Sequence, residues 1–399
     1  MRREAGWLYL LLGGTVLVQA AVFAGRPMTT YRALELGAST TVVGLIVASF
    51  AVVPLVLAVP AGRGVDGNRA RAFLRYGAGL SLLGAVALAA APSLLLLALG
   101  NAVAGVGLLL SAIAAQGIIA RRAPSEDHDR AFGLFTVAAS VGQLIGPVLS
   151  GAAASHLPGG PRAGLAAASL LAVLLLVVSL AYRQSERAAS REPGTDPAPG
   201  TDGNPARLLG MIRTRGMSPA MLASLSLLTC VDLITAFLPV LAQERGISPA
   251  TVGWLLALRA FASIVSRLMV ARLAARWGRR WVLVGSMVVA AVALVLFTLG
   301  SATAVLVALM LVAGFALGLG QPLTMSWVVG LVPERSRATA LALRLGANRA
   351  GQVAVPAAAG VVAGLGGAAG VFVLTGVMLT GAATGVLLSR AGSGSPGGG

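Results

Sequence analysis

The sequence contains no lysine, so all 30 of its basic residues are arginines. Without lysine there is no Walker phosphate-binding loop, and we do not expect this chain to use ATP. The single cysteine, Cys230, excludes a disulfide framework and a thiolate metal site. The two histidines, His128 and His156, are predicted below to lie on opposite sides of a membrane, so they cannot share a metal ion. Because no nucleophile–base pair or metal-binding constellation remains, we expect neither an enzyme nor a cofactor.

Charged residues are also scarce, at 11% of the chain, whereas 57% of the residues are hydrophobic. The mean hydropathy of +0.88 is typical of a chain solvated mainly by lipid. A helix that spans a bilayer needs about 20 predominantly apolar residues, and the sequence offers twelve such stretches. We therefore predict an all-α integral membrane protein with twelve transmembrane helices. The predicted spans are Trp7–Ala24, Thr40–Pro60, Phe73–Ala90, Ser93–Ala120, Ala131–Ala154, Gly164–Tyr182, Met217–Leu241, Ala250–Val270, Trp281–Leu299, Ala304–Leu331, Ala338–Leu365 and Gly370–Leu388.

The arginines are distributed unevenly between the two sides of this predicted membrane protein. Most of the net charge of +17 falls at the N-terminus, in the turns after spans 2, 4, 8 and 10, in a central polar stretch and at Arg390. The opposite side is predicted to carry only Arg26, Arg32, Arg162 and Arg245. Because positive residues favour the cytoplasmic side, we predict a multi-pass protein of the cell membrane with both termini in the cytoplasm. The basic charge thus reflects topology, and no nucleic-acid partner is expected.

One long polar interval divides the spans into two sets of six. Residues 183–216 are rich in Pro, Gly, Ser and Asp and are predicted to form a flexible cytoplasmic linker. The remaining divisions are an N-terminal six-helix bundle at 1–182, a C-terminal bundle at 217–390 and a disordered tail at 391–399.

The two halves align without gaps when the sequence is shifted by 209 residues. Matches at Glu, Gln, Pro and Arg carry the most weight, because Ala, Gly and Val are common throughout the chain. The register indicates a duplicated six-helix unit. The aligned pairs include Glu35 with Glu244, Gly44 with Gly253, Arg71 with Arg280, Gly105 with Gly314, Gln143 with Gln352, Pro147 with Pro356 and Gly151 with Gly360.

Two parallel six-helix repeats joined by a cytoplasmic linker are typical of alternating-access carriers. Over nearly its whole length the chain resembles a transporter of the major facilitator superfamily, similar to bacterial drug and metabolite:proton antiporters. The resemblance implies two pseudo-symmetric six-helix bundles around a central cavity, lined mainly by spans 1, 4, 7 and 10, with spans 3, 6, 9 and 12 toward lipid. We expect a monomer that moves a small molecule across the bilayer.

The turn after span 2 resembles the signature motif of this family, which implies a cytoplasmic gate. Small residues allow close helix approach, and an acid at a helix end can pair with an arginine of a neighbouring helix. The first copy keeps its glycine and its acid, whereas the second keeps only its basic half. A basic turn that merely orients the helices is the alternative. The gate candidates are Gly62, Asp66, Arg71, Arg272, Arg276, Gly278, Arg279 and Arg280.

Span 5 carries a motif that resembles one found in exporters that exchange substrate for protons. Its residues are Gly142, Gly146, Pro147 and Gly151, with Ser150 at a position where the family often has a second glycine. Small residues four apart permit close helix packing, and the proline bends the helix. The motif favours export, and a packing seam common to many carriers is the alternative.

Ionisable residues within the bilayer are costly and are candidates for function. Asp232 in span 7 is the only acid well inside a predicted span, and Arg259 in span 8 is predicted at the same depth. We therefore predict an Asp232–Arg259 pair that couples transport to protons, with a static ion pair as the alternative. Further polar candidates for the substrate cavity are Gln19, Asn101, Gln116, Gln143, Arg344, Asn348, Arg349 and Gln352.

Arginines outnumber acids among these candidates, which favours an anionic or strongly polar substrate over a lipophilic cation. Our first interpretation is proton-coupled export of a small organic molecule. Proton-coupled uptake of an organic anion or nutrient is the alternative within transport. A sensor or assembly factor that uses a carrier fold without transport is the alternative from another class.

Overall fold

The computed structural model describes residues 6–64, 69–123, 128–182, 210, 214, 216–300, 302–333 and 337–389. Its regular elements within these ranges are long helices. In the N-terminal half they are α1 (Gly6–Glu35), α2 (Thr40–Gly64), α3 (Ala70–Ala90), α4 (Leu94–Arg122), α5 (His128–His156) and α6 (Pro161–Ala181). In the C-terminal half they are α8 (Met217–Glu244), α9 (Pro249–Trp277), α10 (Arg279–Leu299), α11 (Thr303–Gly330) and α12 (Arg337–Leu388). The predicted linker lies almost wholly outside the described residues.

Eleven described helices are long and apolar enough to cross a membrane. The last of them, α12, contains two of the predicted spans, because its backbone leaves the helical conformation at Gly366 and Gly367. Gly367 has a φ of 69°, which a residue with a side chain rarely adopts. The prediction of twelve spans in an all-α fold is therefore confirmed.

The first span is longer than the sequence analysis predicts. Helix α1 continues through Pro27 to Glu35, eleven residues beyond the expected end at Ala24. Arg26 and Arg32 consequently lie within α1 instead of in a loop, so the predicted end of the first span at Ala24 is wrong, whereas the side of the membrane predicted for these arginines stays a prediction. Arg32 is stabilised there by donating to the carbonyl of Ala91 (3.0 Å) and to the carboxylate of Glu35 (3.1 Å).

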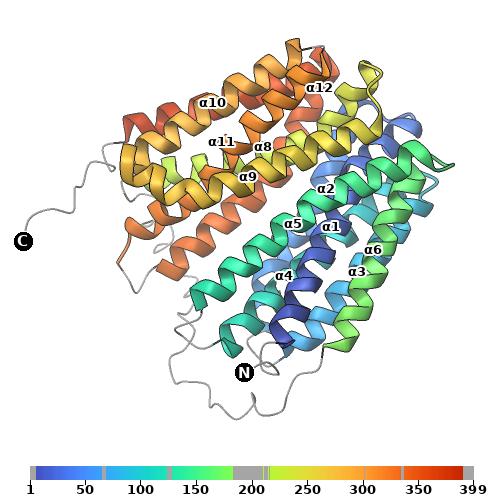
Figure 1. Cartoon of the computed structure of the whole chain (residues 1–399), viewed down its shortest axis with the longest axis horizontal. Helices are drawn as coiled ribbons and strands as arrows, with labels where there is room; N and C mark the ends of the chain where they lie inside the picture. Colours follow the sequence, from blue (N-terminus) through green and yellow to red (C-terminus); the bar gives the residue numbers. More distant parts are fainter. Residues whose placement is uncertain are drawn as a thin grey trace, which may run out of the picture.

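The helices form two bundles that lie side by side (Figure 1). In the N-terminal bundle α1 packs against α5 and α6, and α3 packs against α4. The corresponding contacts in the C-terminal bundle join α8 to α12, α9 to α11 and α10 to α11. Large apolar side chains remain exposed on the outer helices, including Leu170 of α6 and Leu299 of α10. This surface suits a lipid environment.

The two bundles meet through glycines that obey the 209-residue register. A Cβ atom at Gly44 would lie closer than 3.0 Å to the carbonyl oxygen of Pro356, and one at Gly253 would collide in the same way with Pro147. The pair Gly151 and Gly360 repeats this arrangement against Pro249 and the carbonyl of Thr41. We call Gly44, Gly151, Gly253 and Gly360 the inter-bundle seam. The internal repeat seen in the sequence therefore corresponds to a pseudo-symmetric contact between the bundles.

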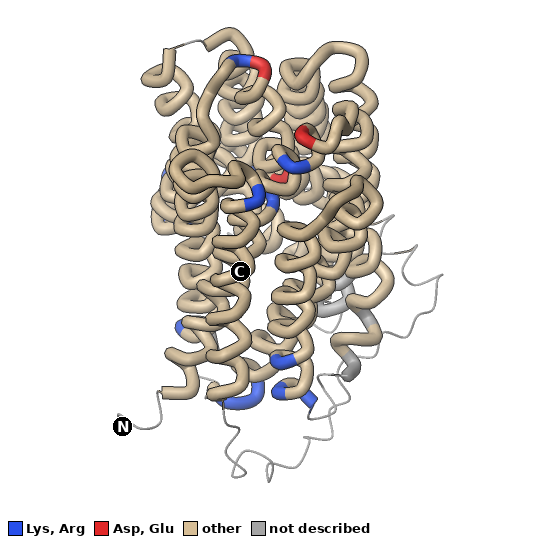
Figure 2. Tube along the Cα trace, turned by 90° about the vertical axis from the view of Figure 1, so that its right-hand side faces the viewer, with Lys and Arg blue, Asp and Glu red and all other residues tan. Residues whose placement is uncertain are grey.

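Hydrogen bonds reinforce the inter-bundle seam. The Thr41 hydroxyl donates to the carbonyl of Gly360 (3.2 Å), and the Ala250 amide donates to the Ser155 hydroxyl (2.9 Å). These residues belong to the ends of helices that the sequence analysis places on the extracellular side. The described charged residues lie partly near the end of the molecule where α1 begins and partly in its other half (Figure 2).

Candidate functional site

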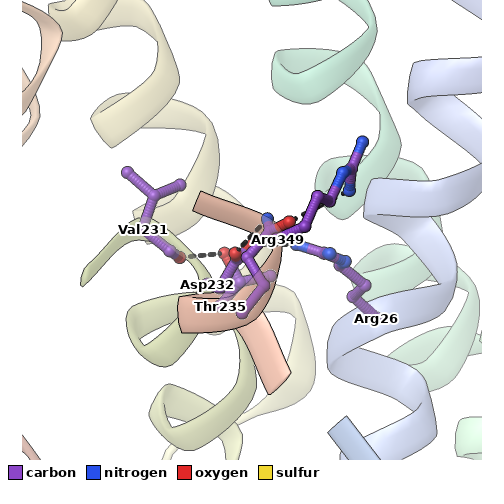
Figure 3. Close-up of polar contacts among 6 residues, drawn as sticks. Arg26, Val231, Asp232, Thr235 and Arg349 are labelled. Atoms are coloured by element: carbon purple, nitrogen blue, oxygen red, sulfur yellow. Dashed lines mark hydrogen bonds and ion pairs between the residues drawn. The ribbon is translucent and has the colours of Figure 1, made fainter. Parts of the chain in front are cut away.

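Asp232 lies on α8, a helix buried on nearly all sides, and its side chain is 8% exposed. One carboxylate oxygen forms an ion pair with Arg26 of α1, and the other accepts a hydrogen bond of 2.6 Å from Gln352 Nε2 of α12. Figure 3 shows Arg26 reaching Asp232 from the opposite bundle. The site thus joins the N-terminal and C-terminal halves of the chain.

Arg26 is also held by aromatic rings. Its guanidinium carbon lies 4.3 Å from the ring centroid of Phe50 on α2 and 5.5 Å from that of Phe23 on α1. Such cation–π contacts are stronger when the cation is shielded from water. The rings therefore help to hold the guanidinium group oriented toward Asp232.

Arg349 of α12 reaches the same site through Gln352. Its Nη1 donates to Gln352 Oε1 (2.9 Å), while the amide nitrogen of Gln352 donates to Asp232. The glutamine amide consequently connects a second arginine to the carboxylate without a direct ion pair.

The predicted Asp232–Arg259 ion pair is not formed, and this prediction is wrong. Arg26 and Gln352 occupy the two oxygens of Asp232, since α1 extends far enough to bring Arg26 to that depth. Arg259 of α9 is nevertheless buried, with 2% of its surface exposed. Its Nε and Nη2 atoms have no hydrogen-bond partner among the described residues.

A second cluster of polar residues lies on α8, α11 and α12, toward the predicted cytoplasmic half of the C-terminal bundle. Arg344 donates to the side-chain oxygen of Gln321 (2.5 Å) and to the Thr324 hydroxyl (3.2 Å). Asn348 accepts a hydrogen bond from Ser224 (3.1 Å). Arg344 and Asn348 are therefore buried and partnered within one bundle, away from the ion pair.

The polar candidates of the N-terminal half occupy different environments. Asn101 is buried on α4 and donates to the carbonyl of Ile46 (2.7 Å). Gln19 is half-buried on α1, beside a small separate cavity, and its Oε1 has no partner among the described residues. Gln143 is half-buried on α5, whereas Gln116 is exposed on α4. Of these four residues, Asn101 is the one that lines a cavity with Asp232.

That cavity lies between the two bundles. Its volume of about 20 Å³ is enough for one ordered water but not for an organic substrate. A substrate could occupy this place only after the bundles move apart. The lining residues are Arg26, Thr29, Val47, Phe50, Asn101, Asp232 and Ala236.

The gate motif is described only in part. Asp66 lies outside the described residues, and a Cβ at Gly62 would meet no other atom within 4 Å. In the second copy Arg272, Arg276, Gly278 and Arg279 are exposed, and Arg280 donates to the carbonyl of Leu387 at the end of α12. Arg71 of the first copy is half-buried. A gate formed by this motif stays a prediction.

The span-5 motif forms helix contacts on two sides of α5. A Cβ at Gly142 would lie closer than 3.0 Å to the carbonyl of Val16 on α1, and one at Gly146 would meet that of Ala20. Pro147 and Gly151 instead face α9 across the inter-bundle seam. The motif therefore has a packing role, and its association with export stays a prediction.

The sequence analysis did not identify Arg26, Phe50 or Gln321 as candidates. Arg26 was excluded by the early end assigned to the first span. The 209-residue register contained the missing signal, because it aligns Leu241, the predicted end of span 7, with Arg32 and not with Ala24. Phe50 and Gln321 have no comparable signal, since an apolar ring or a lone amide within a span is common.

The architecture also agrees with comparisons to known proteins, although no curated protein sequence matches the chain. The chain resembles a bacterial homologue of the human lysosomal transporter Spinster in an inward-facing, unoccupied conformation. The TM-score is 0.78 at 16% identity, over 98% of this chain and 99% of that one. It resembles the nucleoside transporter NupG (TM-score 0.78, 14% identity, 95% and 98% covered) and a D-xylose-proton symporter (TM-score 0.72, 16% identity, 96% and 97% covered).

These structural similarities show the fold, and a sequence profile shows the family. The profile of the Major Facilitator Superfamily matches residues 11–244 and again residues 220–396, so that together the matches cover nearly the whole chain. Because this profile, the twelve spans and the two pseudo-symmetric bundles agree, the chain belongs to the Major Facilitator Superfamily and is a membrane transporter, not an enzyme.

Proposed function

We propose that this protein is a proton-coupled secondary transporter that works by alternating access and that Asp232 is its proton-binding group. The observation that carries the proposal is the ion pair between Asp232 and Arg26, because it connects the two bundles at a buried position. A proton on Asp232 would cancel the attraction to Arg26 and weaken this connection. Proton binding and bundle movement would then be linked through one carboxylate.

The contacts between the bundles suggest which state the structure represents. The inter-bundle seam closes the end of the molecule predicted to be extracellular, next to the ion pair. We therefore interpret the structure as a state in which access from that side is blocked. In the proposed cycle the seam opens when the cytoplasmic gate around Asp66 and Arg71 closes. The carrier is proposed to act as a monomer in the cell membrane, with both termini in the cytoplasm.

Two directions of transport are compatible with this mechanism. The span-5 motif favours export in exchange for protons, which is our first candidate. Uptake of an organic anion together with protons is the second candidate, and it is supported by the excess of buried and half-buried arginines over carboxylates around Asp232. A carrier-fold sensor would not need a titratable group between the bundles.

The test begins with a thermal-stability screen of the purified protein against organic anions, cations and sugars. Compounds that raise the unfolding temperature are then added to vesicles containing the protein and an internal pH dye. We expect a stabilising compound to move protons across the membrane and the Asp232→Asn variant to move none. Transport of the compound without any proton movement would contradict the proposal, and the sign of the pH change identifies the direction of coupling.

A further inference from the structure

Arg259 is a buried cation that forms no direct ion pair with a carboxylate of the described residues. It is 2% exposed, and its Nε and Nη2 atoms have no hydrogen-bond partner among the described residues. These two nitrogens lie on the same edge of the guanidinium group, and that edge can bind a carboxylate or phosphate with two parallel hydrogen bonds. A buried charge that lacks a partner is costly and calls for an explanation.

The surroundings of Arg259 increase the local positive charge. It interacts electrostatically with Arg26 and with Arg267, whose Nη1 donates to the Ser140 hydroxyl (2.9 Å) on α5. Arg349 also interacts with Arg26 and with Asp232. We call Arg26, Arg259, Arg267 and Arg349 the arginine cluster. Asp232 is the one carboxylate that the described residues place among these four cations.

The pseudo-symmetry of the two bundles shows that helix packing at this position does not require an arginine. Shifted by 209 residues, Arg259 corresponds to Phe50, and both residues present their carbonyl oxygen to a glycine, Gly314 and Gly105 respectively. The C-terminal bundle therefore has an arginine where the N-terminal bundle has a phenylalanine in the same backbone setting. Because an apolar side chain fits this contact, the arginine is explained better by binding than by packing.

From these observations we infer that the arginine cluster binds the anionic group of the substrate, a carboxylate or a phosphate, with the free edge of Arg259 as its principal anchor. This inference rests on the proposed transport function and names the class of its substrate. Asp232 acts as an internal anion that occupies Arg26 while the site is empty. The substrate anion enters when the bundles move apart, since the present cavity has room for about one water.

The same arrangement couples proton binding at Asp232 to anion binding at the arginine cluster. Other ionisable groups near Asp232 are Arg26 on α1, Cys230 on α8, Arg259 on α9 and Arg349 on α12, and α11 contains no charged residue. Protonation of Asp232 removes the competing negative charge and frees Arg26 for the substrate. A proton therefore strengthens anion binding, and by linkage the anion strengthens proton binding. The two are therefore expected to cross the membrane in the same direction, which favours proton-coupled uptake, the second candidate above, over export in exchange for protons.

The experiment measures thermal unfolding of the full chain in lipid nanodiscs with succinate, benzoate and phenyl phosphate. Succinamide, benzamide and phenol serve as neutral counterparts of succinate, benzoate and phenyl phosphate, and chloride tests for a simple inorganic counterion. We expect at least one of the three organic anions to raise the unfolding temperature, more strongly as the pH falls, with no effect of its neutral counterpart. Equal effects of the anions and their neutral counterparts, equal stabilisation by chloride, or no effect of any organic anion would overturn the inference.

Variants assign the effect to Arg259. Arg259→Gln should weaken binding of the stabilising anion about tenfold or more, because a charge-assisted pair of hydrogen bonds is lost. The variant removes an uncompensated charge, so without ligand it should unfold at the same or a higher temperature. Arg162→Gln removes one exposed charge from α6 and should bind as the natural chain does. Unchanged binding by Arg259→Gln would contradict the anchor role.

The failure of this inference is distinguishable from failure of the proposed function. Anion binding that depends on Arg259, with no transport or proton movement in vesicles, would support the anion site and refute the proton-coupled carrier. Proton-coupled transport of a sugar or a cation, with no stabilisation by any anion, would support the proton-coupled carrier and refute the anion site. Asp232→Asn provides a further check, because its anion affinity should be high and independent of pH.

Discussion

Arg26, which is half-buried, and Asp232, which is buried, form an ion pair that joins α1 of one bundle to α8 of the other. Both residues lie within membrane-spanning helices, where an unpaired charge is costly. Each charge therefore depends on the other for its stability, and the contact between the bundles depends on both. Any event that neutralises Asp232 therefore changes the contact between α1 and α8 as well as the charge of the site.

Removal of Arg26 alone should destabilise the protein. Arg26→Leu leaves the Asp232 carboxylate buried without its cation, a change that typically costs about 3–5 kcal/mol. The double variant Arg26→Leu with Asp232→Asn should recover most of this loss, because neither charge then remains. Thermal unfolding of the two variants and of Asp232→Asn alone gives the coupling energy. A double variant no more stable than Arg26→Leu would show that the ion pair does not determine this stability.

Replacement of Asp232 should separate transport from its energy source. Asp232→Asn keeps the shape and the hydrogen-bonding capacity of the side chain but cannot bind and release a proton. We expect loss of substrate accumulation driven by a pH gradient, while exchange of labelled for unlabelled substrate continues. Both rates can be measured in the same vesicle preparation. Accumulation at the natural rate would exclude Asp232 as the coupling residue.

Hydropathy alone predicts the spans well but determines the end of α1 poorly. The segment from Gly25 to Glu35 contains two arginines and a proline, and such residues normally mark the end of a span. Tertiary contacts reverse that expectation, since Arg26 is paired with Asp232 and Arg32 donates to Ala91 and Glu35. The internal repeat indicates the correct length, because the matching acids Glu35 and Glu244 each end a helix.

The ion-pair partner could not be derived from depth alone. Asp232 and Arg259 were predicted at the same depth on consecutive helices, and both are buried as that prediction requires. Sequence spacing does not state, however, toward which neighbour each side chain points. The contact of α1 with α8 across the two bundles decides the pairing, and this contact depends on the whole fold.

The predicted topology can be tested by chemical labelling in intact cells. A cysteine introduced at Thr195, in the predicted linker, should react with a membrane-impermeant maleimide only after the cells are opened. The natural Cys230 is buried and should contribute little background. A cysteine at Leu157, an exposed position at the end of α5, should react in intact cells. Labelling of the Thr195 position from outside would contradict the cytoplasmic assignment of the linker.

The gate prediction can be tested at Asp66. Asp66→Asn should reduce the transport rate, because the carboxylate can no longer pair with an arginine in the outward-open state. Expression and thermal stability should remain close to those of the natural chain, since a surface charge typically contributes about 0–1 kcal/mol. Asp196→Asn, in the predicted linker, removes the same charge and serves as the control. Equal transport rates of the two variants would indicate that the motif determines topology and does not form a gate.

The inter-bundle seam predicts how a single methyl group should change the conformational equilibrium. Gly253→Ala places a Cβ against the carbonyl oxygen of Pro147, so α5 and α9 cannot approach as closely as they do here. We expect the bundles to separate at this end and the equilibrium to shift toward the opposite, outward-open state. Gly285→Ala on α10 adds the same methyl group where no atom lies within 4 Å, and it should leave the equilibrium unchanged.

Spin labels at Leu157 and Leu365 report this separation, because these exposed residues lie at the seam end of different bundles. Their distance distribution should shift to longer values in Gly253→Ala and stay the same in Gly285→Ala. The symmetric variant Gly44→Ala, which would meet Pro356, should reproduce the shift. If Gly253→Ala and Gly44→Ala both retain the distances of the natural chain, the close glycine contacts are not what holds this end of the transporter closed.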